Sequence, residues 1–499
     1  MSATRRTQTA SRDADAGLGL AEPGLLRVSS WIGGAWDKSS PAGVFAVTNP
    51  ADGEEITGVL AADADRAAAA VDAAHRAFGP WSRLLPQERA DVLKRWHALI
   101  LEHKEDLARL MTLEQGKPVS EARGEIDYGA SFVEFFAEEA KRPDIMSVTS
   151  HLNDAEVEVW REPVGVAALV TPWNFPNAML TRKAAAALAI GCTVVAHPSR
   201  ETPLSALALA ELAARAGLPA GVFNVVVGDA AEIVGTWTQD TRVRALSFTG
   251  STGVGRLLYE QCAPTIKRLS LELGGHAPFI VFADADLDKA VREAIKAKFA
   301  TSGQDCLGAN RFFVERPVYA AFCEKFAEAA RALSVGNGLE DPDIGPLMND
   351  RAIAKQREHV DDAVARGAKV LCGGGVMDLG PLFFAPTVLA DVPDAAKILH
   401  EETFGPVAAV APFDTEDEAV ARANATEYGL MAYVHTRDPS RIYRVSRALE
   451  FGMLGINRTK VTGAPIPFGG MKQSGLGREG SRHGIEAFSD VKYVCRDWS

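Results

Sequence analysis

Cysteine is scarce in this 499-residue chain, and no two cysteines lie close together in the sequence. The six are Cys192, Cys262, Cys306, Cys323, Cys372 and Cys495. Because no CxxC pair and no zinc-ligand spacing occurs, the sequence predicts no disulfide framework and no metal site, but reduced thiols in a reducing compartment. We therefore expect a cytoplasmic protein.

Long basic runs and long apolar runs are also missing. No basic stretch offsets the net charge of −12 locally, which disfavours nucleic acid as a partner. No apolar run reaches the roughly 18 residues of a membrane span, so no membrane partner is expected. Residues 1–23 contain arginines, but also Asp13 and Asp15, and no apolar segment follows. We interpret them as a loosely ordered tail rather than a transit peptide.

The length exceeds what one ordinary core organises, and two regions alternate strand-like and helix-like segments. The first runs from Gly165 to Gly274 and the second begins at Ala277. This alternation is typical of doubly wound parallel sheets. We predict an α/β fold with two such domains, one formed by residues 1–142 and 165–273 and the other by residues 274–477.

Residues 143–164 and 478–499 differ from their surroundings because they alternate polar and apolar side chains without a helical period. They predict a projecting hairpin and a terminal strand, half exposed to solvent. Exposed strand edges invite pairing with another subunit, so we expect these segments to mediate a homodimer or homotetramer. The alternative is that these strand edges are covered by other segments of the same chain.

A glycine-containing turn, Gly250-Ser-Thr-Gly-Val-Gly255, joins a predicted strand to a predicted helix. Glycines allow close backbone approach to a ligand, and a helix N-terminus offers unpaired N–H groups to a phosphate. The spacing is not that of the GxGxxG fingerprint, however. A plain tight turn explains the segment as well.

Three side chains with chemical potential lie on predicted loops or strand ends. Cys306 lies in "TSGQDCLGANR", Glu272 in "LELGGHAP" and Asn174 in "PWNFP". A thiol can act as a nucleophile, a carboxylate as a base, and a rigidly held amide as a donor to an oxyanion. Taken singly, a packed thiol, a solvated carboxylate and a turn residue are the simpler interpretations.

Taken together, the motifs are more informative. The order "TPWNFP", "FTGSTGVG", "LELGG", "GQDC", "EETFGP" and "PFGGMKQSGLGREG" resembles the aldehyde dehydrogenase superfamily from about Trp31 to the C-terminus. Within it, "FPNAMLTRKAAAALAIGCTVV" and "SGLGREGSRHGIEAFSDVKYVC" are most similar to the succinate-semialdehyde dehydrogenase branch. The resemblance implies that residues 1–142 and 165–273 bind a dinucleotide and that residues 274–477 carry the nucleophile.

The resemblance also implies roles for individual residues. In catalysis it implies Cys306 as nucleophile, Glu272 as general base, Asn174 as oxyanion donor and Lys183 as a lysine near the active site. For the nicotinamide cofactor it implies contacts from Pro172, Trp173, His197, Arg200, Gly228, Gly250, Ser251, Gly255, Leu273, Glu402 and Phe404.

The expected reaction is oxidation of an aldehyde to a carboxylic acid through a thioester on Cys306 that Glu272 helps to hydrolyse. CoA-dependent relatives lack this glutamate, so its presence favours hydrolysis. A reactive thiol also predicts a polar, partly electropositive loop that favours the thiolate. A cofactor-free thiol hydrolase and a non-catalytic relative are the alternatives from other classes.

Departures from the family pattern affect cofactor choice. His197 and Arg200 stand where a lysine and, in NAD-preferring members, a glutamate are usual. Arg200 could pair with a 2′-phosphate, so the expectation is NADP or NAD, with a slight preference for NADP. The alternative is that Arg200 points to solvent and Glu201 matters instead.

The substrate end departs from the pattern as well. Arg182 matches one of two arginines that the semialdehyde branch offers to a distal carboxylate, and Ala300 replaces the other. Arg458, Lys460 and Thr462 are candidates for replacement contacts. We expect succinate semialdehyde or a similar short carboxylated aldehyde as substrate, an uncharged aldehyde being the alternative. For Arg182 the simpler interpretation is an ion pair on a helix surface.

Overall fold

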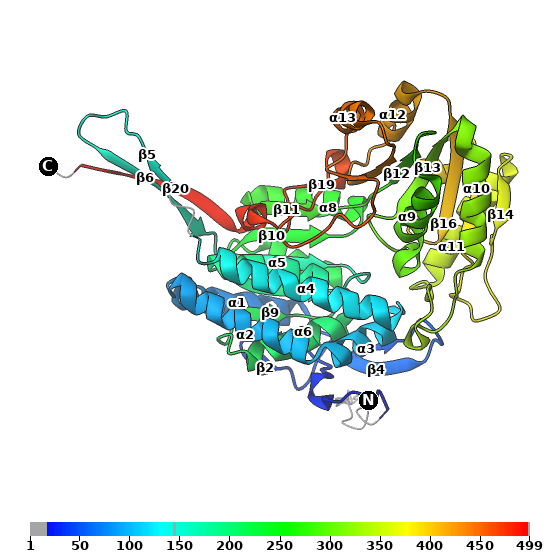
Figure 1. Ribbon diagram of the computed structural model, residues 1–499. Coiled ribbons are helices and arrows are strands. Elements are labelled where there is room, and N and C mark those ends of the chain that lie inside the picture. The colour runs from blue at the N-terminus through cyan, green and yellow to red at the C-terminus, as the bar shows by residue number, and fades with distance from the viewer. Residues whose placement is uncertain (1–16, 143–145, 498–499) are drawn as a thin grey trace.

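The computed structural model describes residues 17–142 and 146–497, which form two α/β bodies and a projecting arm (Figure 1). Most of the expected N-terminal tail, residues 1–16, lies outside the described residues. Residues 17–25 are fixed in place, because the N–H groups of Ala21 and Glu22 each donate to the Asp106 carboxylate at 2.8 Å. A short 3₁₀ turn, Pro23–Leu25, follows. No helix in the described part of the chain is long and apolar enough to cross a membrane.

The first sheet has eight strands within the described residues. Their order is β19 (Gly475–Leu476), β11 (Arg268–Glu272), β10 (Val243–Thr249), β7 (Val166–Thr171), β8 (Thr193–Pro198), β9 (Phe223–Val225), β1 (Trp31–Ile32) and β2 (Ala35–Trp36). The strands from β11 to β9 are parallel, whereas β19, β1 and β2 pair antiparallel at the edges. Thus β19 extends the first sheet although its residues lie in the range expected for the second domain.

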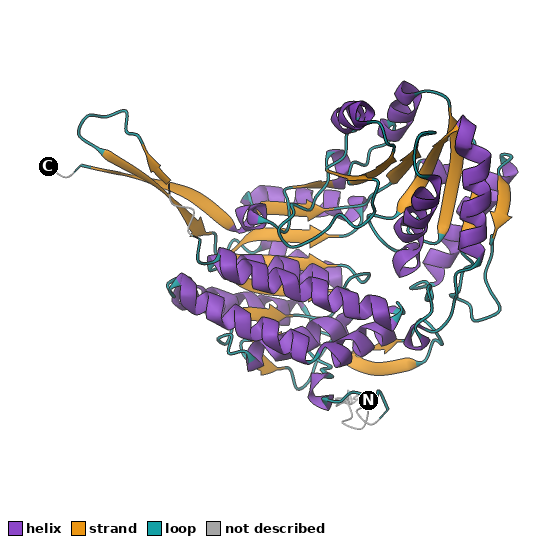
Figure 2. Cartoon of the chain, in the orientation of Figure 1, coloured by secondary structure: helices purple, strands orange, loops and turns teal. Residues whose placement is uncertain are grey.

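Helices cover both faces of this sheet (Figure 2). One face carries α1 (Ala64–Ser82), α7 (Ala230–Gln239) and α8 (Thr252–Cys262). The other carries α5 (Ala178–Ile190) and α6 (Pro203–Arg215), with α2 (Pro86–Glu102), α3 (Lys104–Gln115) and α4 (Val119–Glu139) packed outside them. Side chains of β7 alternate between the two cores, with Leu169 in one and Ala168 in the other. Burial on both faces explains why the strand is apolar throughout.

The second sheet has seven strands within the described residues. Their order is β14 (Lys369–Cys372), β15 (Thr387–Ala390), β16 (Val407–Phe413), β13 (Ala309–Glu315), β12 (Ala277–Val281), β17 (Met431–His435) and β18 (Met453–Ile456). All pairings are parallel except that of β14. Its faces carry α9 (Leu287–Phe299) and α10 (Arg316–Arg331) on one side, and α11 (Asp350–Ala365), α12 (Glu416–Asn424) and α13 (Pro439–Ala448) on the other. The predicted α/β class with two doubly wound sheets is confirmed.

The arm is a three-stranded antiparallel sheet with β6 (Glu156–Pro163) between β5 (Met146–Val148) and β20 (Ser489–Arg496). It extends away from the body of the molecule (Figure 1). The central strand β6 is therefore paired on both sides within the chain. The outer edges of β5 and β20 stay unpaired among the described residues. Apolar side chains on these outer strands are exposed, including Met146, Val491 and Tyr493. A separate hairpin, β3 (Val44–Thr48) and β4 (Glu55–Leu60), packs against the first body.

The carboxyl ends of three neighbouring parallel strands meet at one edge of the first sheet. Thr171 ends β7, Thr249 ends β10 and Glu272 ends β11, with Thr249 and Glu272 directly paired. The loops that follow these strands are therefore adjacent, which is where open α/β sheets bind ligands. This edge faces the second body.

Candidate active site

A cleft of about 470 Å³ lies between the carboxyl edge of the first sheet and the second body; we call it cleft I. It brings together predicted residues from five of the six quoted sequence motifs. Those that line it are Pro172, Trp173, Asn174, Gly250, Ser251, Glu272, Leu273, Cys306, Glu402 and Phe404. The motifs that carried the resemblance thus converge on one cavity.

A second cavity of about 330 Å³, cleft II, lies on the other side of Cys306. The thiol residue lines both clefts, so it stands at their junction. Of the predicted substrate residues, Arg182, Lys460 and Thr462 line cleft II. Ala300 lines it too, which leaves space where a longer side chain would project.

The loop that carries Cys306 is held in an unusual backbone conformation. Thr301 and Ser302 have φ values of 50° and 57°, in the left-handed region that non-glycine residues rarely adopt. Such residues cost of order 1–3 kcal/mol each and persist only where the surroundings fix them. The Ser302 hydroxyl donates to the Gly345 carbonyl at 2.9 Å, and the loop then reaches Cys306 before β13.

Two glycines allow other segments to pack against this loop. A Cβ on Gly275 would lie 2.1 Å from the Cys306 carbonyl oxygen, and one on Gly303 would lie 2.3 Å from the Gly405 carbonyl oxygen. The "LELGG" segment therefore needs glycine for close approach rather than for flexibility. These contacts fix the nucleophile loop against the strand that ends in Glu272 and against the loop of Glu402 and Phe404.

Asn174 is buried, and one neighbour orients its side-chain amide while another holds its backbone. Its Nδ2 donates to the Gln304 carbonyl at 3.0 Å, and Lys117 Nζ donates to the Asn174 backbone carbonyl at 2.8 Å. An asparagine amide has two N–H donors, so the second stays available on the side that lines cleft I. The side chain can therefore donate to an oxyanion formed beside Cys306.

The charge environment of the thiol differs from the electropositive loop expected from sequence. Burial, together with Glu272 and Asp305, raises the pKa of the Cys306 thiol well above its usual value. Burial also raises the pKa of the Glu272 carboxyl to about 8, although Arg182 and Lys183 oppose the shift. Neither Glu272 oxygen has a hydrogen-bond partner among the described residues. The thiol is thus protonated at rest, beside a carboxyl group whose raised basicity suits it to accept a proton.

Arg182 and Lys183 are buried and share one carboxylate, that of Glu479. Arg182 Nε donates to Glu479 Oε2 at 2.7 Å, and Lys183 Nζ donates to Glu479 Oε1 and to the Ser247 hydroxyl. The Arg182 guanidinium also lies 4.2 Å from the ring centroid of Phe468. Arg182 is 1% exposed, so it is not a helix-surface ion pair, which was the simpler interpretation of the sequence.

Cleft I fits a dinucleotide. Ser251 caps the N-terminus of α8, where free N–H groups can hold a phosphate, and the buried Thr249 hydroxyl at the cleft wall has no partner among the described residues. Trp173 and Phe404 meet edge to face with centroids 5.6 Å apart. Glu402 accepts a hydrogen bond from the Gly275 N–H at 2.8 Å, and burial raises its pKa to about 6. These groups could hold the ribose and the nicotinamide ring.

Six of the predicted site residues line neither cleft: Lys183, His197, Arg200, Gly228, Gly255 and Arg458. The His197 ring hydrogen-bonds the Val226 carbonyl at 3.0 Å, and burial lowers its pKa to about 4, so it is neutral. Arg200 is exposed, with its guanidinium 4.4 Å from the Phe45 ring centroid. A Cβ on Gly255 would lie 2.4 Å from the Leu273 side chain, which makes it a packing glycine.

Other residues line the clefts although sequence reasoning did not select them for a role. In cleft I these include Arg351 and Lys355, and in cleft II Glu121, Tyr128 and Asp305; Glu201, named above as the alternative to Arg200, also lines cleft I. Arg351 and Lys355 are one helical turn apart at the start of α11, a spacing that is common on any exposed helix. Glu479 lies in the quoted "GREG" segment, but nothing in the sequence points to its partners, almost 300 residues away.

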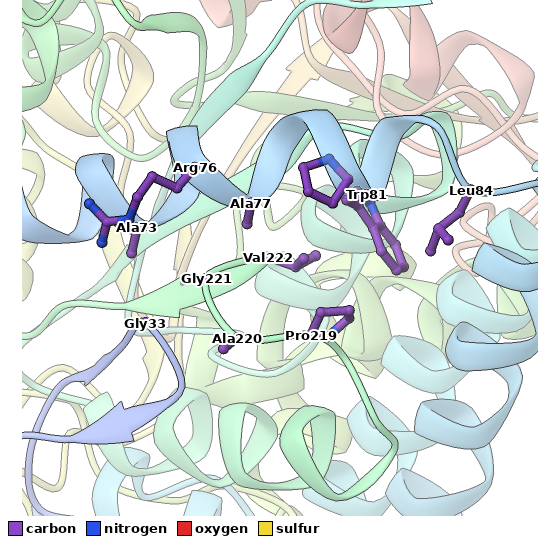
Figure 3. A pocket seen from close by; sticks show the side chains of 11 residues that line it. Gly33, Ala73, Arg76, Ala77, Trp81, Leu84, Pro219, Ala220, Gly221 and Val222 are labelled. Carbon is purple, nitrogen blue, oxygen red and sulfur yellow. The ribbon is translucent and has the colours of Figure 1, made fainter.

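A third hollow, between α1 and the segment Pro219–Val222, shows that size alone does not identify the active site (Figure 3). Its volume of about 450 Å³ is close to that of cleft I. Its lining is largely apolar, with Arg76 as the one charged side chain among the described residues. The hollow holds no nucleophile or base.

Comparisons with known proteins agree with this geometry. The succinate-semialdehyde dehydrogenase [NADP(+)] of Escherichia coli (strain K12) is 52% identical over 477 residues, 95% of this chain and 99% of the relative. The 3-sulfolactaldehyde dehydrogenase of Pseudomonas putida is 52% identical over 479 residues, 96% of this chain and 99% of the relative. The crystal structure of succinate-semialdehyde dehydrogenase from Burkholderia pseudomallei is 48% identical, with a TM-score of 0.95, covering 96% of this chain and all of that one.

The model of the aldehyde dehydrogenase family matches residues 36–494. The chain therefore belongs to the aldehyde dehydrogenase family, which confirms the resemblance seen in the sequence. It is an NAD(P)-dependent oxidoreductase that acts on aldehydes.

The shared carboxylate of Glu479 gives a stability prediction. Replacing Glu479 with glutamine should lower the free energy of unfolding by roughly 3–5 kcal/mol, because it leaves buried cations without a counter-charge. Glu427→Gln, which breaks the exposed pair with Arg256, is the control and should cost about 0–1 kcal/mol. Thermal unfolding of both variants checks this, and equal losses would contradict it.

Proposed function

We propose that this enzyme oxidises a short aldehyde with an anionic group at its far end, such as succinate semialdehyde, to the corresponding acid. The observation that carries the proposal is the position of Cys306 at the junction of two clefts. The cofactor would occupy cleft I and the aldehyde would enter through cleft II, so that the aldehyde carbon meets the thiol from the opposite side.

In the proposed reaction the Cys306 thiol loses its proton to Glu272 and attacks the aldehyde carbon. The free N–H of Asn174 would donate to the resulting oxyanion; losing one such donor typically costs on the order of 10²–10³ in rate. When bound, the cofactor supplies a hydride acceptor at the nicotinamide ring. After the proton from Cys306 has passed from Glu272 to solvent, the ionised carboxylate would take a proton from water as that water attacks the Cys306 thioester. This step releases the acid and returns the cysteine as leaving group, without a CoA acceptor.

Cleft II supports an anionic substrate. Arg182 is fixed at its wall by Glu479 and Phe468, and Lys460 is exposed at its rim. Lys460 has no carboxylate within salt-bridge distance among the described residues, so its charge is free to meet a substrate. The names of two relatives point the same way, because succinate semialdehyde carries a carboxylate and 3-sulfolactaldehyde a sulfonate.

The choice of nicotinamide cofactor depends on two adjacent residues. Glu201 lines cleft I and accepts a hydrogen bond from Ser199, whereas Arg200 is exposed beside it. We propose that NADP is accepted and slightly preferred, with Arg200 pairing with the 2′-phosphate. The E. coli relative whose name specifies NADP supports this proposal.

We further propose a cytoplasmic homo-oligomer, dimer or tetramer, assembled through the arm. The exposed Val491 and Tyr493 and the unpaired outer edges of β5 and β20 support this.

We also propose that residues 1–142 and 165–273 form the dinucleotide-binding domain and residues 274–477 the catalytic domain. The residues that line cleft I support this assignment. Trp173 and Ser251 belong to the dinucleotide-binding domain, and Cys306 to the catalytic domain.

The raised pKa of Glu272 predicts the pH dependence of the reaction. The carboxyl group acts as a base only when ionised, and burial raises its pKa to about 8, so kcat/KM should increase as pH rises through about 8. Steady-state rates across pH check this for the wild type and for Glu272→Gln, which should lose this limb. An unchanged profile in the variant would assign the limb to another group.

Two neighbouring cations test the substrate assignment. Lys460→Met should lower kcat/KM for succinate semialdehyde by about 10- to 100-fold, the value of a charge-assisted hydrogen bond, and leave an uncharged aldehyde of similar length unaffected. Arg458→Met is the matched control, because Arg458 lies in the same loop but outside the cleft. Formation of reduced nicotinamide measures both, with Cys306→Ala as the inactive reference. A wild type that prefers uncharged aldehydes would overturn the anionic substrate.

Arg200→Ala tests the cofactor assignment. It should weaken NADP binding by about tenfold or more and leave NAD binding unchanged, because only NADP carries the 2′-phosphate. Dissociation constants from quenching of tryptophan fluorescence check this without turnover. Unchanged binding of both cofactors would instead favour Glu201 as the residue that reads the ribose.

A further inference from the structure

We infer that Glu121 is a positioning residue, which holds the nucleophile loop in place from the opposite domain. The inference rests on the proposed role of Cys306 as nucleophile. Glu121 lies in the first turn of α4, in the dinucleotide-binding domain. It hydrogen-bonds to the loop at Ala300–Gly303, which leads to Cys306 in the catalytic domain.

The contact is made at the point where the loop backbone is strained. The Thr301 N–H donates to both Glu121 oxygens, at 3.1 and 2.9 Å, and the Thr301 hydroxyl donates to Oε2 at 3.2 Å. Thr301 is the first of the left-handed residues, with φ of 50°. A carboxylate that accepts from both groups of this residue fixes its conformation.

The same row of side chains also holds the oxyanion loop. Lys117, Glu121 and Glu125 are spaced four residues apart. Lys117 Nζ donates to Glu125 Oε2 at 2.5 Å and to the Asn174 carbonyl, and Glu125 Oε1 accepts from the N–H groups of Asn177 and Ala178. One short stretch of chain thus sets the positions of both the Asn174 loop and the Cys306 loop.

A role in reaction geometry explains Glu121 better than a role in charge pairing. No cation lies within salt-bridge distance of its carboxylate among the described residues, and burial raises its pKa, although the charge of Lys117 and the hydrogen bonds from Thr301 oppose the shift. The hydrogen bonds of this carboxylate all come from Thr301 among the described residues. A side chain kept for stability alone would gain more from an ion pair.

The test compares Glu121→Ala, Glu121→Gln and Thr301→Val in the full-length enzyme. Asp127→Asn is the control, because Asp127 is an exposed acid on the same helix that pairs with Lys104 at 2.6 Å. Three quantities are measured for the folded protein: kcat and KM, the dissociation constant of the dinucleotide, and the rate at which iodoacetamide modifies the Cys306 peptide at alkaline pH, followed by mass spectrometry.

We expect Glu121→Ala to lower kcat by about 100-fold, the usual effect of a displacement near 1 Å, with dinucleotide affinity unchanged and the Cys306 alkylation rate altered. Glu121→Gln keeps one acceptor oxygen and should recover most of the loss, and Thr301→Val should show a smaller loss of the same kind. If Glu121→Ala does not fold, the kcat and alkylation rates of Glu121→Gln and Thr301→Val test the positioning role.

Wild-type kcat in the variants, or a fall that only follows the loss of folded protein with alkylation unchanged, would overturn the positioning role. So would a glutamine variant no better than alanine. The proposed function fails separately, if alkylation of Cys306 in the wild type leaves activity intact.

Discussion

The backbone of Gly275 passes against the carbonyl group of Cys306, and the geometry of the active site depends on that contact. A Cβ at Gly275 would lie 2.1 Å from the carbonyl oxygen, so any other residue would push the Cys306 loop away from this segment. Glu272 lies three residues earlier, at the end of β11, and Glu402 accepts from the Gly275 N–H. This one close contact therefore sets the relative positions of three groups: the candidate base, the thiol and the carboxylate placed to hold the ribose. Their positions do not depend on three independent loops.

Burial at this junction gives the site its chemical character. The pKa of the Cys306 thiol is raised by burial first and then by Glu272, Asp305 and Glu402, while Arg182 opposes the shift. A thiol in such surroundings is a poor nucleophile in the free enzyme, because the thiolate is the reactive form. Oxidants and alkylating agents also attack the thiolate, so we expect the same burial to slow both reactions in the free enzyme. Reactivity has to be created by proton transfer to a neighbouring base, a role that the raised pKa of the Glu272 carboxyl suits.

The sequence was sufficient for the fold class and for most of cleft I, because parallel strands are apolar throughout and the chemical residues follow strand ends. It was less informative about the short edge strand β19, where two residues carry no periodicity. Glycines were also ambiguous: Gly255 was expected to approach a ligand but packs on Leu273. The partners of buried charges could not be predicted, since Glu479 meets Arg182 only through the folded chain. The prediction of an electropositive loop around Cys306 was wrong, because the burial of the thiol and its acidic neighbours are also set by the folded chain and are not visible in the local sequence.

The position of β19 has a consequence for how the enzyme is made. Gly475 pairs with Glu272, the Leu273 N–H donates to the Ser474 carbonyl at 2.9 Å, and Glu479 supplies the counter-charge for two buried cations. These residues are synthesised after the rest of both sheets. Until residues 474–479 have left the ribosome, the nascent chain lacks the strand that pairs with β11 at Glu272 and the carboxylate that neutralises Arg182 and Lys183. A chain truncated before residue 474 would therefore lack both the partner strand of Glu272 and the counter-charge of two buried cations, so the last strand of the first sheet is part of the active site rather than an appendage.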